Sequence, residues 1–259
     1  MLFKMAVNVE AHGIPMLIMQ TWKTTDIPQD WKAGAESIQR LNPMWRYVLM
    51  TDEDNRNFIA ENFPNYLSRY DGFAYNIERA DFIRYAWLYV HGGIYIDLDY
   101  EMLKSFDDVL AMAPAGGDVY LVQGTVYQSA NAFMISKPRC DFWLYIMDSI
   151  QRDEVSWYHR IEKHLYIIHS TGPGVLLKSV SSYAGDNKIM HLPLEAFPVC
   201  SACEKNFSTS TGRKLEGTSW VDSSGMVYLF MFCNFNTIVI ITIVLLLLLI
   251  LILYMRYMR

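Results

Sequence analysis

The sequence predicts an α/β fold with a largely parallel sheet. Short apolar segments of strand length alternate along the chain with segments in which apolar residues recur at helical spacing. The clearest pair is a helix over residues 77–90, which stops at a double glycine, and a short buried strand at 94–96. No internal repeat or low-complexity block interrupts this alternation. We therefore expect one α/β domain over residues 1–225.

The remaining elements follow from the same patterns. We expect further strands at residues 14–22, 42–51, 119–122 and around Ile189. Helices are expected over 52–62, where an Asx or Thr cap precedes the first turn, and over 142–150. Gly172-Pro173-Gly174 is typical of a turn. The Ser-, Thr- and Gly-rich segment 200–225 indicates a loop-rich end of the domain.

A membrane span is predicted near the C-terminus. Residues 235–254 contain no charged side chain, and a helix of this length spans roughly 30 Å, the thickness of a bilayer's hydrocarbon core. We therefore expect residues 226–259 to form a membrane anchor, in an endomembrane. The side of the membrane stays open. The absence of a visible signal peptide favours a cytosolic domain, whereas Arg256 and Arg259 favour the opposite orientation, in which a sequon at Asn206 would matter.

Composition and charge exclude several kinds of function. The chain has 22 Lys and Arg against 27 Asp and Glu, and no block of five basic residues. Nucleic acid is therefore not an expected partner, because binding to phosphates needs clustered basic residues. An apolar fraction of 52% argues against intrinsic disorder. The four cysteines do not make a disulfide scaffold. The close pair Cys200 and Cys203 could be half a zinc site, a redox pair or a local disulfide, and we expect an incidental pair or a loop staple because zinc needs four ligands.

Two carboxylates stand where the short strand at 94–96 ends. Asp97 and Asp99 are two residues apart, so in an extended chain they point to the same side. At the carboxyl end of a buried strand they would face the crevice in which open α/β sheets bind ligands. Two hard oxygen donors in this place suit Mg²⁺ or Mn²⁺, with water and phosphate oxygens completing the coordination shell. The alternative is a chance pair of solvated aspartates.

A charged pair on the preceding helix adds to this pattern. Asp81 and Arg84 lie three residues apart, on a face away from the apolar stripe. Spacing alone leaves two interpretations open, a surface ion pair or a single site shared with the two later aspartates. In the second, Asp81 would accept hydrogen bonds from sugar hydroxyls and Arg84 would offer a fork of donors to a phosphate.

The segment NIERADFIRYAWLYVHGGIYIDLDYEML resembles the central signature of the glycosyltransferases with a DXD sugar-binding region, glycosyltransferase family 32. The stretches IPMLIMQTWKTTDIPQDWK, NPMWRYVLMTDED, STGPGVLL and GTSW are similar to other parts of that family, so the resemblance covers most of residues 1–225. It implies a GT-A fold, a nucleotide-sugar donor, a divalent metal and retention of the anomeric configuration.

The resemblance also implies roles for single residues in the centre of the chain. Asp99 would ligate the metal, and Asp97 would touch the ribose or a metal-bound water. Asp81 and Arg84 would hold the donor sugar and its phosphate. These four are the expected catalytic residues. Tyr95 would lie beside the nucleoside.

Three more residues are assigned to the donor by the same resemblance. Trp22 would stack on the base, and Ser219 and Trp220 would belong to a segment that closes over the diphosphate. For the two tryptophans a place in the core is the alternative. Many relatives carry a histidine shortly before the closing Ser-Trp, where it completes the metal shell. This chain has none there, so Glu216 or water would take that place.

We therefore expect a metal-dependent retaining transferase that moves a hexose to a membrane lipid or glycan, with GDP-mannose as the first donor and a UDP-hexose as the next. A glycosidase fits less well, because its carboxylates flank the scissile bond from opposite sides. One alternative is a non-catalytic membrane-anchored relative, in view of the missing histidine. Another is a haloacid-dehalogenase-type phosphohydrolase, although its D-x-D motif continues with Thr or Val where this chain has Glu101.

Overall fold

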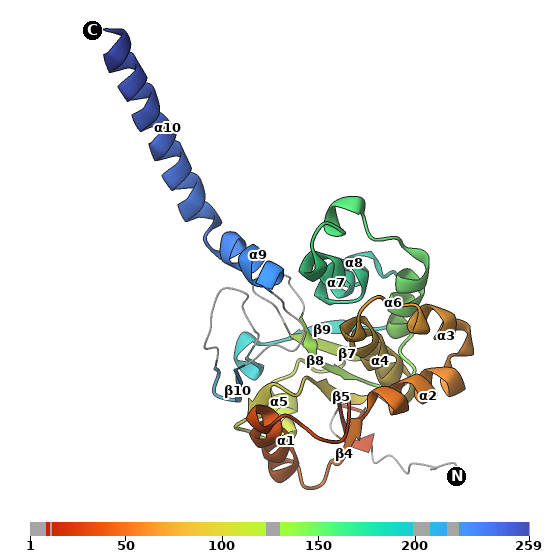
Figure 1. Cartoon of the computed structure of the whole chain (residues 1–259). Helices are drawn as coiled ribbons and strands as arrows, with labels where there is room; N and C mark the ends of the chain where they lie inside the picture. Colours follow the sequence, from red (N-terminus) through yellow and green to blue (C-terminus); the bar gives the residue numbers. More distant parts are fainter. Residues whose placement is uncertain (1–8, 11, 123–129, 199–207, 217–222, 259) are drawn as a thin grey trace. The chain divides into compact units, whose positions relative to one another are not determined.

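The computed structural model describes residues 9–10, 12–122, 130–198, 208–216 and 223–258 (Figure 1). The chain divides into two compact units, Met1–Trp220 and Val221–Arg259. The first unit holds an α/β domain, and the second holds two consecutive helices. That these units act as a catalytic domain and a membrane anchor remains a prediction.

A six-stranded mixed sheet forms the centre of the first unit. Its strands lie in the order β4 (Arg46–Met50), β3 (Leu17–Thr21), β5 (Gly93–Ile96), β8 (Ala130–Ser136), β7 (Val119–Val122) and β9 (Ile189–Leu192). Only β8 is reversed, because it pairs antiparallel with both β5 and β7, whereas the other neighbours are parallel. The predicted α/β fold with a largely parallel sheet is confirmed.

Two small antiparallel sheets accompany the main sheet, β1 (Val9–Glu10) with β2 (Ile14–Pro15), and β6 (Tyr100–Met102) with β10 (Gly212–Lys214). The described helices of the first unit are α1 (Gln29–Leu41), α2 (Asp52–Asn62), α3 (Pro64–Asp71), α4 (Asn76–His91), α5 (Phe106–Ala111), α6 (Asp141–Arg152), α7 (Lys163–Ser170) and α8 (Pro173–Ser182). Short 3₁₀ turns lie at Trp157–His159 and Leu194–Ala196.

Both faces of the main sheet are buried, and alternate residues of each strand point to opposite faces. Met19 of β3 and Tyr95 of β5 belong to one apolar core, which helices α2, α3, α4, α6 and α8 complete. Their neighbours Ile18 and Ile94 belong to a second core, which α1 and α5 complete. Because helices cover both faces, the strand ends are what remains for binding a ligand.

The connection from α4 to β5 requires two glycines. Gly92 has a φ of 64° and Gly93 a φ of 87°. A Cβ on Gly93 would lie 2.4 Å from the carbonyl oxygen of Leu17 on β3, and one on Gly92 would lie 2.6 Å from the backbone nitrogen of Pro138. Only glycine fits both positions. The double glycine thus permits the close approach of β5 to β3 that carries Asp97 to the strand ends.

Most predicted elements are found, with local corrections. The expected strand at 42–51 begins only at Arg46. The residues before it form a turn, in which the backbone N–H of Trp45 donates to the carbonyl oxygen of Asn42, the residue that caps the end of α1. The expected first strand is divided into β2 and β3. The predicted turn at 172–174 is wrong, since Pro173 occupies the first turn of α8, where its fixed φ and missing N–H suit a helix.

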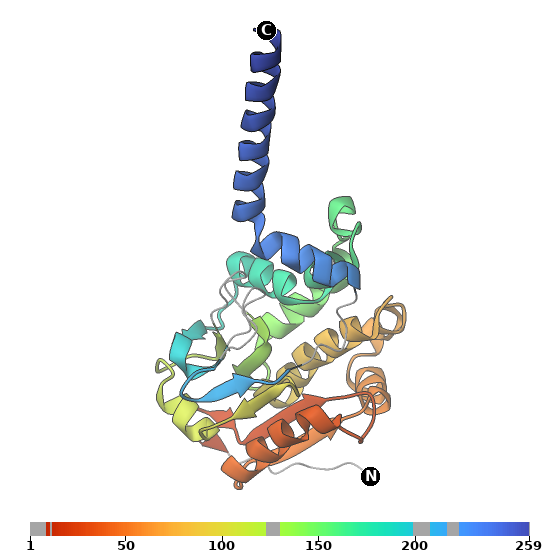
Figure 2. The same cartoon turned by 60° about the vertical axis from the view of Figure 1, so that its left-hand side comes forward.

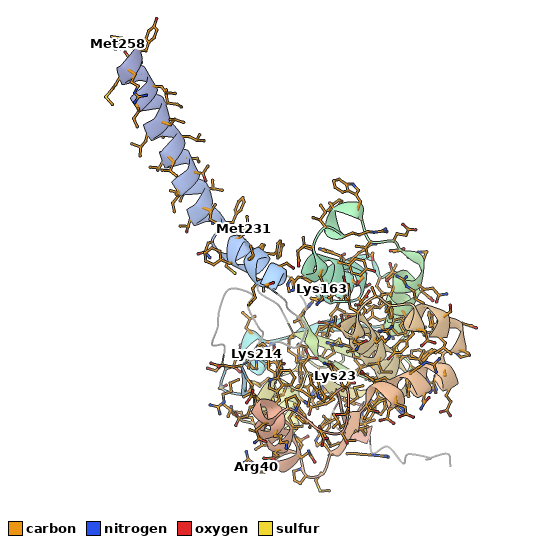
Figure 3. The ribbon with its side chains drawn as sticks, in the orientation of Figure 1. Lys23, Arg40, Lys163, Lys214, Met231 and Met258 are labelled. Carbon is orange, nitrogen blue, oxygen red and sulfur yellow. The ribbon has the colours of Figure 1, made fainter. Side chains whose placement is uncertain are left out.

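The second unit consists of α9 (Ser223–Cys233) and α10 (Phe235–Tyr257), and the chain bends between them (Figure 2). Among the described residues, α10 is the one helix that is long and apolar enough to cross a membrane. Its side chains radiate on all sides and are exposed within the chain (Figure 3). The predicted span at 235–254 therefore coincides with a helix of suitable length and composition, and membrane insertion itself remains a prediction.

Candidate active site

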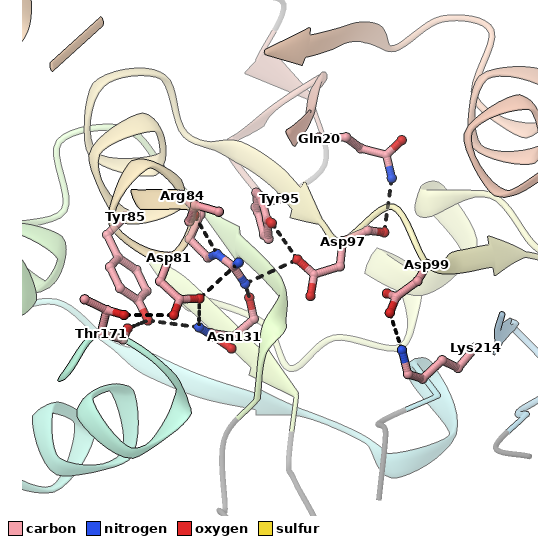
Figure 4. Close-up of polar contacts among 11 residues, drawn as sticks. Gln20, Asp81, Arg84, Tyr85, Tyr95, Asp97, Asp99, Asn131, Thr171 and Lys214 are labelled. Carbon is pink, nitrogen blue, oxygen red and sulfur yellow. Dashed lines mark hydrogen bonds and ion pairs between the residues drawn. The ribbon is translucent and has the colours of Figure 1, made fainter. Parts of the chain in front are cut away.

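The predicted central residues gather at the carboxyl ends of β3 and β5 (Figure 4). These two strands are parallel neighbours, so their ends meet at one edge of the sheet. Gln20, at the end of β3, donates a hydrogen bond from Nε2 to the carbonyl oxygen of Asp97 at 3.1 Å. The backbone N–H of Asp97 donates to the carbonyl oxygen of Ala132 on β8 at 2.9 Å. The turn that carries the two aspartates is thus fixed from both neighbouring strands.

Asp81 and Arg84 of α4 form a buried ion pair at this edge. Arg84 Nη2 lies 3.0 Å from Asp81 Oδ1, and the two residues are each only 3% exposed. Arg84 Nη1 also lies 3.3 Å from Asp97 Oδ1 and donates to the carbonyl oxygen of Asn131 at 2.7 Å. The interpretation as a surface ion pair is therefore wrong. Helix α4 is buried on nearly every side, because it packs against α2, α6, α7 and the sheet.

Three hydrogen-bond donors hold the Asp81 carboxylate. Besides Arg84, Thr171 Oγ1 donates to Asp81 Oδ2 at 2.9 Å, and Asn131 Nδ2 donates to Oδ1 at 2.9 Å. Burial raises the pKa of Asp81 to about 6, although Arg84 and Thr171 act in the opposite direction. The side chain is therefore an anion at neutral pH and becomes protonated in mild acid.

Tyr95 and Arg84 fix the position of the Asp97 carboxylate. The Tyr95 hydroxyl donates to Asp97 Oδ1 at 2.5 Å, and the Arg84 guanidinium lies 4.5 Å from the centre of the Tyr95 ring. Burial alone would lower the pKa of Arg84, but the negative charges of Asp97 and Asp81 raise it, so Arg84 stays a cation. The Asp97 side chain is 31% exposed, so a ligand can reach it. Tyr95 itself is buried and holds both charged partners in place.

Asp99 pairs with a residue from the end of the domain. Its Oδ2 accepts a charged hydrogen bond from Lys214 Nζ on β10, whereas its Oδ1 is buried and has no hydrogen-bond partner among the described residues. Burial raises the pKa of Asp99, and the Lys214 charge opposes that rise. The carboxylates of Asp97 and Asp99 lie on the same side of the turn that follows β5 (Figure 4).

The two aspartates fit a small divalent cation with an incomplete set of protein ligands. A buried carboxylate oxygen without a hydrogen bond beside a second, partly exposed carboxylate is a donor set that Mg²⁺ or Mn²⁺ accepts. Within the described ranges, no group of three or more His, Cys, Asp or Glu side chains could hold a metal. Water and the oxygens of a bound phosphate are suitable further ligands beside these two carboxylates.

Of the four peripheral residues expected at the site, Trp22 and Glu216 lie among the described residues. Trp22 is half-buried and packs edge-on against Trp31, with ring centres 5.1 Å apart, in a cluster that includes Leu98 of the DXD turn. Ser219 and Trp220 lie outside the described residues. Glu216 is exposed, and its carbonyl oxygen accepts a hydrogen bond from the Trp31 indole at 3.0 Å. That Glu216 or water completes the metal shell remains a prediction.

Four contributors to this site escaped the sequence analysis. Gln20 is a buried polar residue at the end of an apolar strand, and Asn131 lies in an apolar segment. A single polar residue in an apolar strand pattern is therefore the sequence signal that could have indicated both residues as part of the site. Thr171 precedes the Gly-Pro motif, which was noted only as a turn. Lys214 gave no local signal, because 115 residues separate it from Asp99.

The sequence of this chain is similar to a described protein family and to several characterised proteins. Residues 28–115 match the family model described as "Glycosyltransferase sugar-binding region containing DXD motif". This match places the DXD aspartates and helix α4 inside a region that is similar to this glycosyltransferase family. It is 38% identical over 160 residues to inositol phosphoceramide mannosyltransferase 2 of Schizosaccharomyces pombe, with 62% of this chain and 44% of that protein covered.

Two other relatives extend the comparison. Mannosyl phosphorylinositol ceramide synthase SUR1 of Saccharomyces cerevisiae is 39% identical over 160 residues, covering 62% of this chain and 40% of that protein. Inositol phosphoceramide mannosyltransferase 1 of S. pombe is 27% identical over 234 residues, covering 85% and 70%. The chain thus spans less than half of the two relatives that match at 38% and 39% identity.

Among solved structures, the chain is similar to PaToxG glycosyltransferase. The TM-score is 0.45 at 17% sequence identity, with 64% of this chain and 68% of that chain covered.

Proposed function

We propose that this chain is a metal-dependent retaining glycosyltransferase that moves a hexose, mannose first, from a nucleotide-sugar donor to a membrane lipid or glycan. The match of residues 28–115 to the DXD family model supports the reaction class. Two relatives are named inositol phosphoceramide mannosyltransferases and a third is named mannosyl phosphorylinositol ceramide synthase, which supports mannose as the sugar and a phosphosphingolipid as the acceptor. A UDP-hexose is the second donor to test.

The observation that carries this proposal is the buried Asp81–Arg84 pair and its 3.3 Å contact with Asp97. Removing ions from water costs several kcal/mol per ion, and apolar residues of similar size often stabilise a protein as well as a buried ion pair does. Stability alone is therefore a poor reason for charges in this place. A site that must recognise a charged, hydroxylated substrate supplies a better one.

The residues of the site divide the recognition of the donor between them. Asp81 is anionic at neutral pH, and its Oδ2 keeps one lone pair beyond the one that Thr171 engages, so this oxygen can accept a hydrogen bond from a sugar hydroxyl. Arg84 is held from Asp81, Asp97 and Asn131, so its positive charge needs no rearrangement when negative charge develops on a leaving phosphate.

The metal would be held by Asp99 and Asp97. When bound, it would stabilise the negative charge of the departing nucleoside diphosphate as a Lewis acid. Gln20 and Tyr95 keep Asp97 in position, through its carbonyl oxygen and its carboxylate respectively. Retention of the anomeric configuration rests on the resemblance to the DXD family.

A membrane-bound acceptor agrees with the second unit of the chain. Helix α10 has 23 residues, so it is about 35 Å long and can cross a bilayer. We propose that it anchors the domain in an endomembrane, where a lipid acceptor is locally concentrated. The side of the membrane is left open.

The test uses the full chain in detergent with Mn²⁺ and a panel of GDP-mannose, UDP-galactose and UDP-N-acetylglucosamine, with nucleoside diphosphate release as the signal. We expect release from GDP-mannose that inositol phosphoceramide increases, and its loss in Asp99→Ala. Asp186→Ala is the matched control, because Asp186 is an exposed aspartate in another loop. Release of phosphate from aryl phosphates without any acceptor would favour the phosphohydrolase alternative. Absence of metal-dependent nucleotide binding would favour the non-catalytic one.

A further inference from the structure

The last described segment of the domain, residues 208–216, places two cationic side chains, Arg213 and Lys214, beside the residues that follow β5. Strand β10 pairs antiparallel with β6, so that Arg213 lies opposite Glu101 and Lys214 opposite Tyr100. The backbone N–H of Leu215 extends this pairing, because it donates to the carbonyl oxygen of Asp99 at 2.7 Å. The register of β10 therefore determines which acidic group each cation meets.

The two cations meet different kinds of carboxylate. Arg213 pairs with Glu101 at 2.6 Å, and its side chain is 57% exposed. Lys214 pairs with Asp99, both side chains are 18% exposed, and the ammonium lies 5.3 Å from the centre of the Tyr100 ring. Arg213 thus forms a surface pair, whereas Lys214 forms a largely buried pair with an aspartate of the DXD motif.

We propose that Lys214 is a built-in counter-cation of Asp99, whose ammonium on Oδ2 a divalent metal bound through the unpartnered Oδ1 pushes away. This rests on the proposed function, in which Asp99 is a metal ligand. An ammonium group and a divalent ion on one small carboxylate repel each other strongly in a partly buried site. Metal binding by the chain alone is therefore weakened by the cost of breaking the Lys214–Asp99 pair.

The displaced ammonium gains a new partner when the donor is present. Its strand keeps Lys214 beside the metal site, where the diphosphate of a nucleotide brings negative charge. Metal and nucleotide therefore favour each other's binding through Lys214, and this coupling acts equally in both directions. The consequence is a chain that binds its metal chiefly together with its nucleotide.

The experiment measures free Mn²⁺ by electron paramagnetic resonance in titrations of the full chain in detergent, at fixed pH and salt, with and without GDP. In Lys214→Met we expect the affinity for Mn²⁺ in the absence of GDP to rise on the order of tenfold. The affinity for GDP at saturating Mn²⁺ should fall by a similar factor. Arg213→Met makes the same charge change on the same strand and should match wild type. Lys214→Arg keeps the charge and should also stay near wild type.

The outcomes separate this inference from the proposed function. Equal Mn²⁺ affinities in wild type, Lys214→Met and Arg213→Met would overturn the inference and leave a metal site intact. Binding of Mn²⁺ by Lys214→Met but not by wild type would support it in its strongest form. If neither binds Mn²⁺ with or without GDP, both the inference and the metal-dependent mechanism are wrong. Lys214→Gln repeats the comparison with a polar side chain, and circular dichroism verifies the fold of each variant.

Discussion

Replacing Thr171 by valine removes a hydrogen bond to the buried Asp81 carboxylate and keeps the shape of the side chain. Thr171 Oγ1 donates to Asp81 Oδ2 at 2.9 Å, and both residues are buried. A hydrogen bond to a charged group contributes about 1.5–3 kcal/mol, and one pKa unit corresponds to about 1.4 kcal/mol. The substitution should therefore raise the pKa of Asp81 from about 6 by about one to two units.

The sign of the effect on stability follows from the direction of that pKa. Burial raises the pKa of Asp81 from 3.8 in the unfolded chain to about 6, so the native state favours the protonated form. The stability gained from that form is complete below pH 3.8 and is lost as the pH rises through 6. In Thr171→Val the pKa of Asp81 is higher, because the carboxylate has lost one hydrogen-bond donor. The loss of stability with rising pH therefore continues to about pH 7–8.

Urea denaturation at pH 5 and pH 8 tests this directly. The free energy of unfolding should fall by about 1.5–3 kcal/mol at pH 8, and by only about 0.5–1.5 kcal/mol at pH 5, where Asp81 is protonated. Thr211→Val is the matched control, because Thr211 is also fully buried but donates to a neutral group, the carbonyl oxygen of Glu195 at 3.2 Å. Its loss should be the same at both pH values. An equally pH-independent loss in Thr171→Val would refute the reasoning.

Three further changes test other parts of the structure. Tyr95→Phe removes the 2.5 Å hydrogen bond to Asp97 and should slow nucleoside diphosphate release about ten- to a hundredfold, and an unchanged rate would show that Asp97 needs no support. Gly93→Ala should lower the free energy of unfolding in urea by more than about 3 kcal/mol, because its Cβ would meet the Leu17 carbonyl oxygen, whereas Gly116→Ala, with a similar φ but open space, should lose only about 1 kcal/mol. Deleting residues 235–257 should move the chain from the membrane pellet to the supernatant, and continued sedimentation would contradict an anchor in α10.

Local signals in the sequence predicted the elements that carry the DXD motif. The helix ending at the double glycine and the strand after it are found as α4 and β5, and the Thr51 cap before α2 is formed by a hydrogen bond with Asp54. These signals depend on residues a few positions apart, so one sequence contains them in full. Pro173 shows the limit of such reasoning, because the same residue suits a turn or the first turn of a helix.

What the sequence left open depends on tertiary packing. Spacing placed Asp81 and Arg84 on one face of a helix, but could not tell whether that face was exposed. Asn131 and Thr171, which are distant in the sequence, contact it. The antiparallel pairing of β8 with β5 and β7, on which Asn131 reaches the site, is a long-range feature without a local sequence signal. The Lys214–Asp99 pair joins residues that no local pattern links.

The central claim is that the two aspartates after β5 hold a cation which binds the diphosphate of the donor. Calorimetric titration of GDP into the full chain with Mn²⁺ tests it most directly, in wild type and in Asp99→Ala. We predict that the wild-type chain binds GDP in the presence of Mn²⁺ and loses this binding when EDTA removes the metal. The Asp99→Ala variant should keep its fold and show no metal-dependent binding of GDP. Binding of GDP and Mn²⁺ by Asp99→Ala with the affinity of wild type would contradict it.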